Sequence, residues 1–104
     1  MQIEHVDYTP KKDVYHPGEV LYVSLTFADP FVGECEIGFA AKSADLVRRT
    51  TCRQSTTRLY EGQVYIHDDQ VGACLLKAAL TPVSGEPRTV SAGDRVFQIR
   101  PVTP

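Results

Sequence analysis

The fold class is decided by the stretch Val20-Leu21-Tyr22-Val23-Ser24-Leu25-Thr26-Phe27, which follows a Pro17-Gly18 turn in this 104-residue chain. The apolar side chains at positions 21, 23, 25 and 27 point to one side of an extended backbone, and those between them point to the other. Strict alternation that is rich in β-branched and aromatic residues is typical of a half-buried antiparallel strand. The stretch therefore predicts an all-β protein.

Seven such extended segments can be placed along the chain, each bounded by turn residues. They cover residues 3–8, 20–27, 34–41, 46–53, 59–66, 73–80 and 95–99. Segment 46–53 is polar and basic, so we interpret it as an edge strand, where charged side chains discourage unwanted pairing. No segment has apolar residues at helical spacing over three turns. Short strands separated by turns predict a single β-sandwich or barrel domain over residues 1–104.

Composition and charge exclude several classes of protein. A net charge of −2 argues against a nucleic-acid-binding module or an anionic-membrane module, and there is no apolar run long enough for membrane insertion. The amino-terminal residues lack the layout of a signal peptide, which favours a cytoplasmic location unless the chain is an excised piece of a larger protein. The chain has no Asn and more Arg than Lys, so we expect a bacterial source.

Three motifs give the chain a resemblance to a known architecture. They are Tyr15-x-Pro17-Gly18-Glu19, Tyr60-Glu61-Gly62-Gln63-Val64-Tyr65-Ile66 and Gly72-Ala73-Cys74-Leu75-Leu76-Lys77-Ala78. The first opens a strong second strand, and the others resemble the fifth and sixth strands of immunoglobulin-like domains of the bacterial or fibronectin type III sort. The resemblance implies a seven-stranded antiparallel immunoglobulin-like β-sandwich. The chain has no Trp and no cysteine in the second strand, so the inter-sheet bridge of antibody domains cannot form.

The three cysteines are candidates for reactivity. Cys35 and Cys74 fall on the inward phase of their segments, and in an immunoglobulin-like layout their strands would be neighbours, so the two thiols would lie close. We interpret them as buried apolar groups and expect no obligatory disulfide. Cys52 is flanked by Arg49 and Arg53, whose charge would favour a thiolate, so we expect Cys52 to be the most accessible and reactive thiol.

No catalytic, metal or cofactor site is predicted. His5, His16 and His67 are far apart in the sequence and have no metal-ligand spacing. The sequence His67-Asp68-Asp69 is interpreted as a turn, because a calcium loop needs more oxygen ligands. The arginines of 48–58 are interpreted as a solvated edge, with binding of an anion or an acidic partner as the alternative. We therefore expect that the protein is not an enzyme.

Two sheet faces are candidates for binding. Tyr22 and Tyr65 are expected to point outward from one sheet, and exposed tyrosines are typical contact residues for proteins and sugars. The other sheet is expected to show a flat surface of small apolar groups. This surface consists of Gly38, Ala40, Ala73, Leu75 and Ala79. Such a surface loses little side-chain entropy when it is buried against another domain or a second copy.

The predicted function is therefore that of a non-catalytic accessory or protein-binding module that acts through a sheet face. Its partner would be another protein, a neighbouring domain or a second copy of the chain. The alternative is a carbohydrate-binding module that uses the surface tyrosines, although sugar-binding sandwiches usually present Trp. The predicted binding residues are Tyr22, Tyr65, Leu75, Ala40 and Ala73.

Overall fold

The computed structural model describes residues 3–46 and 48–102, and these residues form two β-sheets and no helix. The all-β fold class is thus confirmed. The strands are β1 (Ile3–Thr9), β2 (Val14–Tyr15), β3 (Val20–Phe27), β4 (Gly33–Ala40), β5 (Thr50–Thr51), β6 (Arg53–Gln54), β7 (Leu59–Tyr65), β8 (Gly72–Pro82) and β9 (Arg88–Ile99). In this part of the chain no helix is long and apolar enough to cross a membrane.

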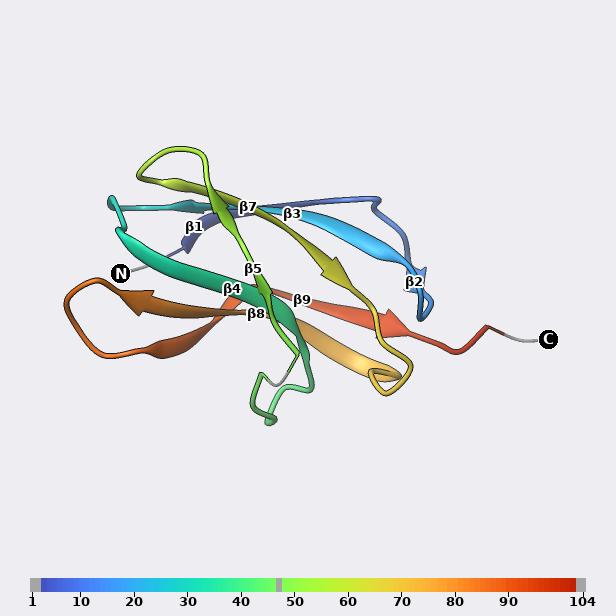
Figure 1. The fold of residues 1–104 in the computed structure, drawn as a ribbon. Helices are drawn as coiled ribbons and strands as arrows, with labels where there is room; N and C mark the ends of the chain where they lie inside the picture. Colours follow the sequence, from blue (N-terminus) through green and yellow to red (C-terminus); the bar gives the residue numbers. More distant parts are fainter. Residues whose placement is uncertain (1–2, 47, 103–104) are drawn as a thin grey trace.

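The two sheets form two layers, which Figure 1 shows one above the other. One sheet has the strand order β1-β3-β7-β6, and the other has the order β2-β9-β8-β4-β5. Within the described residues, the chain changes layers five times, between β1 and β2, β2 and β3, β3 and β4, β5 and β6, and β7 and β8. All pairings are antiparallel except that of β2 with β9, which is parallel, so the sheets are not antiparallel throughout.

Two of the predicted segments differ from the structure. Segment 46–53, expected as one edge strand, is instead the two short strands β5 and β6, which belong to different sheets. The break falls at Cys52, whose side chain turns inward between the layers. The last strand begins at Arg88 and not at Arg95, because an irregularity around Gly93 (φ +80°) interrupts its alternation. The register shifts there from Leu75 opposite Val96 to Lys77 opposite Ser91.

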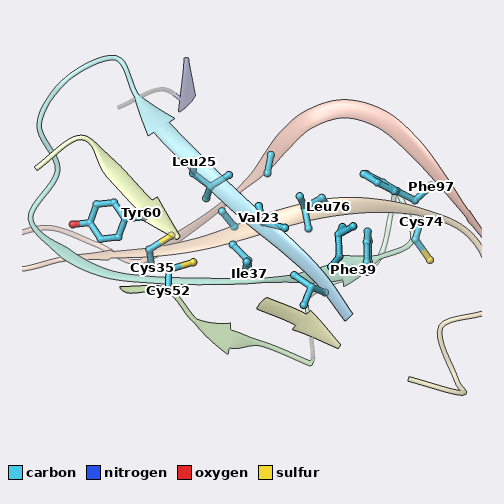
Figure 2. Packing of buried hydrophobic residues seen from close by; sticks show 14 of the residues in the cluster. Val23, Leu25, Cys35, Ile37, Phe39, Cys52, Tyr60, Cys74, Leu76 and Phe97 are labelled. Atoms are coloured by element: carbon cyan, nitrogen blue, oxygen red, sulfur yellow. The ribbon is translucent and has the colours of Figure 1, made fainter. Parts of the chain in front are cut away.

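The core lies between the layers and follows the predicted inward phase of the strands. Leu25, Phe39, Leu76 and Phe97 are all buried, as expected. The Phe39 ring of β4 and the Phe97 ring of β9, which belong to the same sheet, meet edge to face with centroids 5.0 Å apart. Figure 2 shows these side chains converging from both sheets. Such packing of large apolar groups is the main source of stability for a domain of this size.

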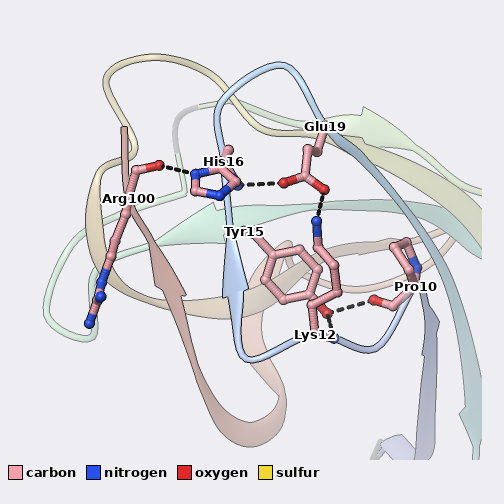
Figure 3. A network of polar contacts seen from close by, with 6 residues as sticks. All are labelled: Pro10, Lys12, Tyr15, His16, Glu19 and Arg100. Carbon is pink, nitrogen blue, oxygen red and sulfur yellow. Dashed lines mark hydrogen bonds and ion pairs between the residues drawn. The ribbon is translucent and has the colours of Figure 1, made fainter. Parts of the chain in front are cut away.

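A network of polar contacts holds β2 at the first crossing between the layers (Figure 3). The hydroxyl of buried Tyr15 donates to the Pro10 carbonyl at 2.6 Å and accepts from the Lys12 amide at 3.0 Å. The Glu19 carboxylate accepts from the His16 amide at 2.7 Å and forms an ion pair with the Lys12 ammonium. The Pro-Gly turn before β3 and the strand β2 are therefore fixed to each other by side chains.

Candidate functional site

The predicted face of small residues is largely covered by the chain itself. Leu46 is buried and packs with Ala40 and Ala79 in a cluster of its own on the outer side of the sheet. Gly38 is also buried, and a β-carbon there would lie 2.1 Å from the Arg48 carbonyl oxygen. The prediction that Ala40 belongs to an open contact surface is therefore wrong, because the segment that follows β4 folds back over it.

Polar contacts hold this covering segment in place. The Lys77 ammonium, which lies beside Gly38 on the same face, donates to the carbonyls of Lys42 at 3.2 Å and Ala44 at 2.7 Å. Arg48 and Asp69 form an ion pair in which Nη2 and Oδ2 are 2.8 Å apart. The segment is thus attached both to the sheet and to the turn that precedes β8.

What remains open of the small-residue face is a short strip. Ala73 is exposed, and Leu75 is half-buried beside exposed Val96, its register partner on β9. The predicted binding residues Ala73 and Leu75 therefore lie on the surface. The other residues of the predicted face, Gly38, Ala40 and Ala79, are buried, so the exposed apolar surface is narrow. Their role in binding stays a prediction.

An open cleft of about 750 Å³ lies at one edge of the two layers. The short strands β5 and β6 pair with only part of β4 and β7, and the cleft lies where this pairing has ended. We refer to this space as the edge cleft. Its floor is formed by the buried side chains of Ile37, Phe39 and Val64, and its walls include Ala40, Ala44, Arg48, Tyr65, His67, Asp69 and Ala73. The cleft therefore brings Tyr65, predicted on one face, together with Ala40 and Ala73, predicted on the other.

The rim of the edge cleft combines charge with aromatic surface. Arg48 Nε donates to Asp69 Oδ1 at 3.1 Å and Arg48 Nη2 donates to Asp69 Oδ2 at 2.8 Å. This hydrogen bonding lowers the pKa of the Asp69 carboxyl and raises the pKa of the Arg48 guanidinium, although both groups are solvated. The Tyr65 and His67 rings meet edge to face with centroids 4.9 Å apart. An apolar floor with a few polar groups at the rim is typical of a binding site.

Tyr65 was predicted to bind, but the charged pair at this rim was not predicted from the sequence. Arg48 was interpreted as part of a solvated edge and Asp69 as a turn residue, and they are 21 positions apart. Leu46 was placed in a polar strand, although it was the one leucine of that segment. The apolar pair Leu46-Val47 at the start of an otherwise polar segment was the signal that Leu46 packs against the sheet.

A second, shallower groove lies on the outer face of the other sheet. Tyr22 and Tyr65 are 53% and 49% exposed there, so their predicted outward positions are confirmed. They lie on neighbouring strands, because Tyr22 pairs with Gln63 two residues before Tyr65. We refer to the groove beside Tyr22 as the tyrosine groove. It has a volume of about 450 Å³ and is lined by side chains that include Asp7, Thr9, Tyr22, Ser24, Arg53, Glu61 and Gln63.

The cysteine that lies beside Cys35 is not the one that was predicted. All three are free and buried, and Cys52, at 9% exposed, is the most exposed of them, as predicted. Cys35 lies opposite Leu80 on β8 whereas Cys74 is six residues earlier on that strand, which separates the two by roughly 20 Å. Cys35 lies instead beside Cys52, and the hydrogen bond between their thiols lowers the pKa of Cys52 and raises the pKa of Cys35. Arg49 and Arg53, which were expected to favour the Cys52 thiolate, do not contribute to this lowering of the Cys52 pKa.

Within residues 3–46 and 48–102, no group of three His, Cys, Asp or Glu side chains is arranged to hold a metal ion. No protein-family model matches this chain, and no curated protein matches it either. The candidate site therefore has to be interpreted from its own geometry.

Proposed function

We propose that this chain is a non-catalytic protein-binding module with an immunoglobulin-like fold, and that the edge cleft holds an extended segment of a partner protein. The strand order supports the fold. Immunoglobulin-like domains place strands A, B, E and D in one sheet and strands G, F and C in the other. Here β1, β3, β7 and β6 follow the first order, and β9, β8 and β4 follow the second.

The observation that carries the binding proposal is the coincidence of the edge cleft with an uncovered strand edge. The strand β6 pairs only with Tyr60 and Glu61 of β7. Among the described residues, no strand covers positions 62–65 of β7 on that side. An extended peptide that adds to such an edge gains main-chain hydrogen bonds, and its alternate side chains enter the adjacent pocket.

The chemistry of the cleft indicates the kind of side chain that it takes. The floor of Ile37, Phe39 and Val64 is apolar. Arg48 and Asp69 already satisfy each other at the rim, so a charged side chain would have to replace an existing ion pair. An apolar anchor therefore suits the cleft better than a charged one. The partner is accordingly a protein or neighbouring domain that presents an extended, apolar segment.

The test uses peptides selected from a random library on the wild-type chain, with affinities measured by calorimetry. Ala73→Arg places a long side chain in the cleft, and we expect it to weaken the selected peptides at least about tenfold. Thr89→Arg is the matched control, because Thr89 is exposed on the same sheet outside the cleft. Thermal unfolding of both variants checks that they fold. A library that yields no peptide, or peptides that bind Ala73→Arg unchanged, would contradict the proposal.

The tyrosine groove supports a second candidate, a carbohydrate-binding module. The exposed Tyr22 ring is bordered by the polar side chains of Ser24, Glu61 and Gln63. A sugar ring can stack on an aromatic face while its hydroxyls bond to such groups. A glycan array tests this candidate, with Tyr22→Ala expected to remove any glycan binding and Tyr65→Ala as the comparison. Absence of binding to the array would leave the edge cleft as the site.

A further inference from the structure

Cys35 and Cys52 lie directly opposite each other where the chain crosses between the two sheets. Glu36 of β4 pairs with Thr51 of β5, so the next pair along this ladder is Cys35 with Cys52. The Cys52 amide donates to the Cys35 carbonyl at 2.7 Å, which continues the ladder. Opposite residues in a hydrogen-bonded antiparallel pair have α-carbons about 5.5 Å apart. This separation lies within the range of about 4.4–6.8 Å that a disulfide spans.

The two side chains also point the same way. Both enter the core, where Cys35 is 1% and Cys52 is 9% exposed, and each thiol is the largest influence on the pKa of the other. A β-carbon on Gly62 would lie 3.1 Å from the Cys52 sulfur, so the absence of a side chain there leaves room for the pair. Figure 2 shows Cys35 and Cys52 together beside Tyr60, with Cys74 at the other end of the core beside Phe97.

We propose that Cys35 and Cys52 are a redox-active pair that forms a reversible disulfide by exchange with a low-molecular-weight disulfide such as oxidised glutathione. The Cys52 thiolate attacks one sulfur of the glutathione disulfide, forms a mixed disulfide and releases one glutathione thiolate, which takes up a proton. Cys35 then loses its proton and attacks the Cys52 sulfur, which closes the Cys35–Cys52 bond and releases the second glutathione. The chain loses two hydrogen atoms, and one oxidised glutathione becomes two thiols.

The environment of the pair sets the order of these steps. The hydrogen bond from Cys35 lowers the pKa of Cys52, and Cys52 is the more exposed of the two, so it is the attacking thiol. The same hydrogen bond, together with burial, raises the pKa of Cys35, which therefore acts second. Cys74 has no thiol beside it, and burial raises its pKa, so it stays reduced.

Closing this bond would enclose the segment that covers the small-residue face. The residues between the two cysteines include Leu46, which packs on Ala40, and Arg48, which pairs with Asp69 at the edge cleft. The segment is already continuous with β4 at its first end, and a disulfide from Cys52 to Cys35 would also attach its second end to β4. The segment would consequently open less often in the oxidised chain than in the reduced chain. The disulfide itself does not depend on the proposed binding function.

The experiment incubates the folded chain in buffers of increasing ratio of oxidised to reduced glutathione. After an acid quench, the chain is unfolded and alkylated, and its mass is measured by mass spectrometry. Trypsin then places the two cysteines on different peptides, because it cuts after Lys42 and Arg49. We expect a species that carries one alkyl group, on Cys74, that is two hydrogen atoms lighter than a reduced chain with one alkyl group would be, and that joins the peptides of Cys35 and Cys52. Reduction by glutathione should reverse it.

The variants separate the two steps. Cys74→Ser should behave like the wild type. Cys35→Ser should stop at the mixed disulfide between Cys52 and glutathione, and Cys52→Ser should form neither bond. If the wild type is alkylated at all three cysteines at every ratio, or if the joined peptides contain Cys74, the proposal is wrong. These wild-type outcomes decide the matter even if a serine variant does not fold.

Discussion

Leu46 lies over Gly38, with its Cδ1 atom 2.9 Å from the position that a β-carbon on Gly38 would occupy. The Arg48 carbonyl oxygen lies even closer to that position, at 2.1 Å. The segment after β4 therefore approaches the sheet so closely that only glycine fits beneath it. This contact turns a sheet face that would otherwise be open into an interior surface, and it lies at the border of the edge cleft.

Gly38→Ala tests this contact. The added methyl group meets backbone atoms, which cannot rotate away, so the segment at Leu46 and Arg48 must shift. We expect a loss of about 1–3 kcal/mol in the free energy of unfolding, measured with urea. Ala73→Ser, on an exposed position of the same sheet face, should change it by less than about 0.5 kcal/mol. An equally small effect of Gly38→Ala would mean that the segment does not press on β4 in solution.

Phe39→Ala tests the assignment of the inward phase. Phe39 is buried and packs edge to face on Phe97, so truncation removes apolar contacts and leaves a cavity. We expect a cost of about 3–5 kcal/mol in chemical unfolding. Tyr22→Ala provides a comparison at an exposed aromatic residue and should cost far less. A cost below about 1 kcal/mol for Phe39→Ala would contradict the burial of this ring.

Tyr60→Phe tests a buried hydrogen bond. The Tyr60 hydroxyl donates to the Phe31 carbonyl at 2.7 Å, at the end of the core where the Phe27 and Phe31 rings meet. Removing the hydroxyl leaves this carbonyl with a weaker partner, so we expect a loss of about 1–2 kcal/mol in thermal or urea unfolding. Tyr65→Phe, at an exposed tyrosine, should be neutral. Equal effects of the two variants would show that the bond adds nothing.

Glu19→Gln tests the polar network at the first crossing. The hydrogen bond from Lys12 lowers the pKa of Glu19 in the folded chain below its ordinary value of 4.5. The contribution of this hydrogen bond to the free energy of unfolding is therefore complete above the ordinary pKa, and it is lost as the pH falls through the lower pKa of the folded chain. We expect Glu19→Gln to cost about 1 kcal/mol at pH 7 and less as the pH approaches 3. A pH-independent difference, or one as small as that of Glu86→Gln, would exclude this role.

The oligomeric state tests the small-residue face. Stable interfaces bury about 800 Å² on each partner. The open strip is limited to Ala73, Leu75 and Val96, because Leu46 covers its neighbours. We therefore expect sedimentation to give the mass of one chain at micromolar concentration, both for the wild type and for Leu75→Glu. A wild-type dimer that Leu75→Glu dissociates would restore this face as an interface.

The long strands β3, β4 and β8 could be predicted from the sequence, because the alternation within each strand shows which of its residues are buried. The alternation of Leu21, Val23 and Leu25 records which side of the strand faces the core, and it needs no information from elsewhere in the chain. The longer last strand was not predictable in this way, because Gly93 interrupts the alternation on which the prediction depended. A local pattern is informative only as far as it is regular.

The candidate site was harder to predict because it depends on contacts between distant segments. Alternation placed Ala40 correctly on the outer side of its strand, but it cannot show that Leu46 is folded over that side. The ion pair of Arg48 and Asp69 and the contact of Cys35 with Cys52 likewise require the path of the chain between the sheets. That path is set by packing in three dimensions and leaves little trace in residue spacing.

The repeated crossing between the sheets has a consequence for how the protein unfolds. Each crossing brings strands from both sheets to one shared core, because β3 and β7 bury their inner faces against those of β4 and β8. Neither sheet can separate without exposing the apolar side chains of the other. Native-state hydrogen exchange should therefore find β3, β4, β7 and β8 opening together, as one cooperative unit with a shared free energy.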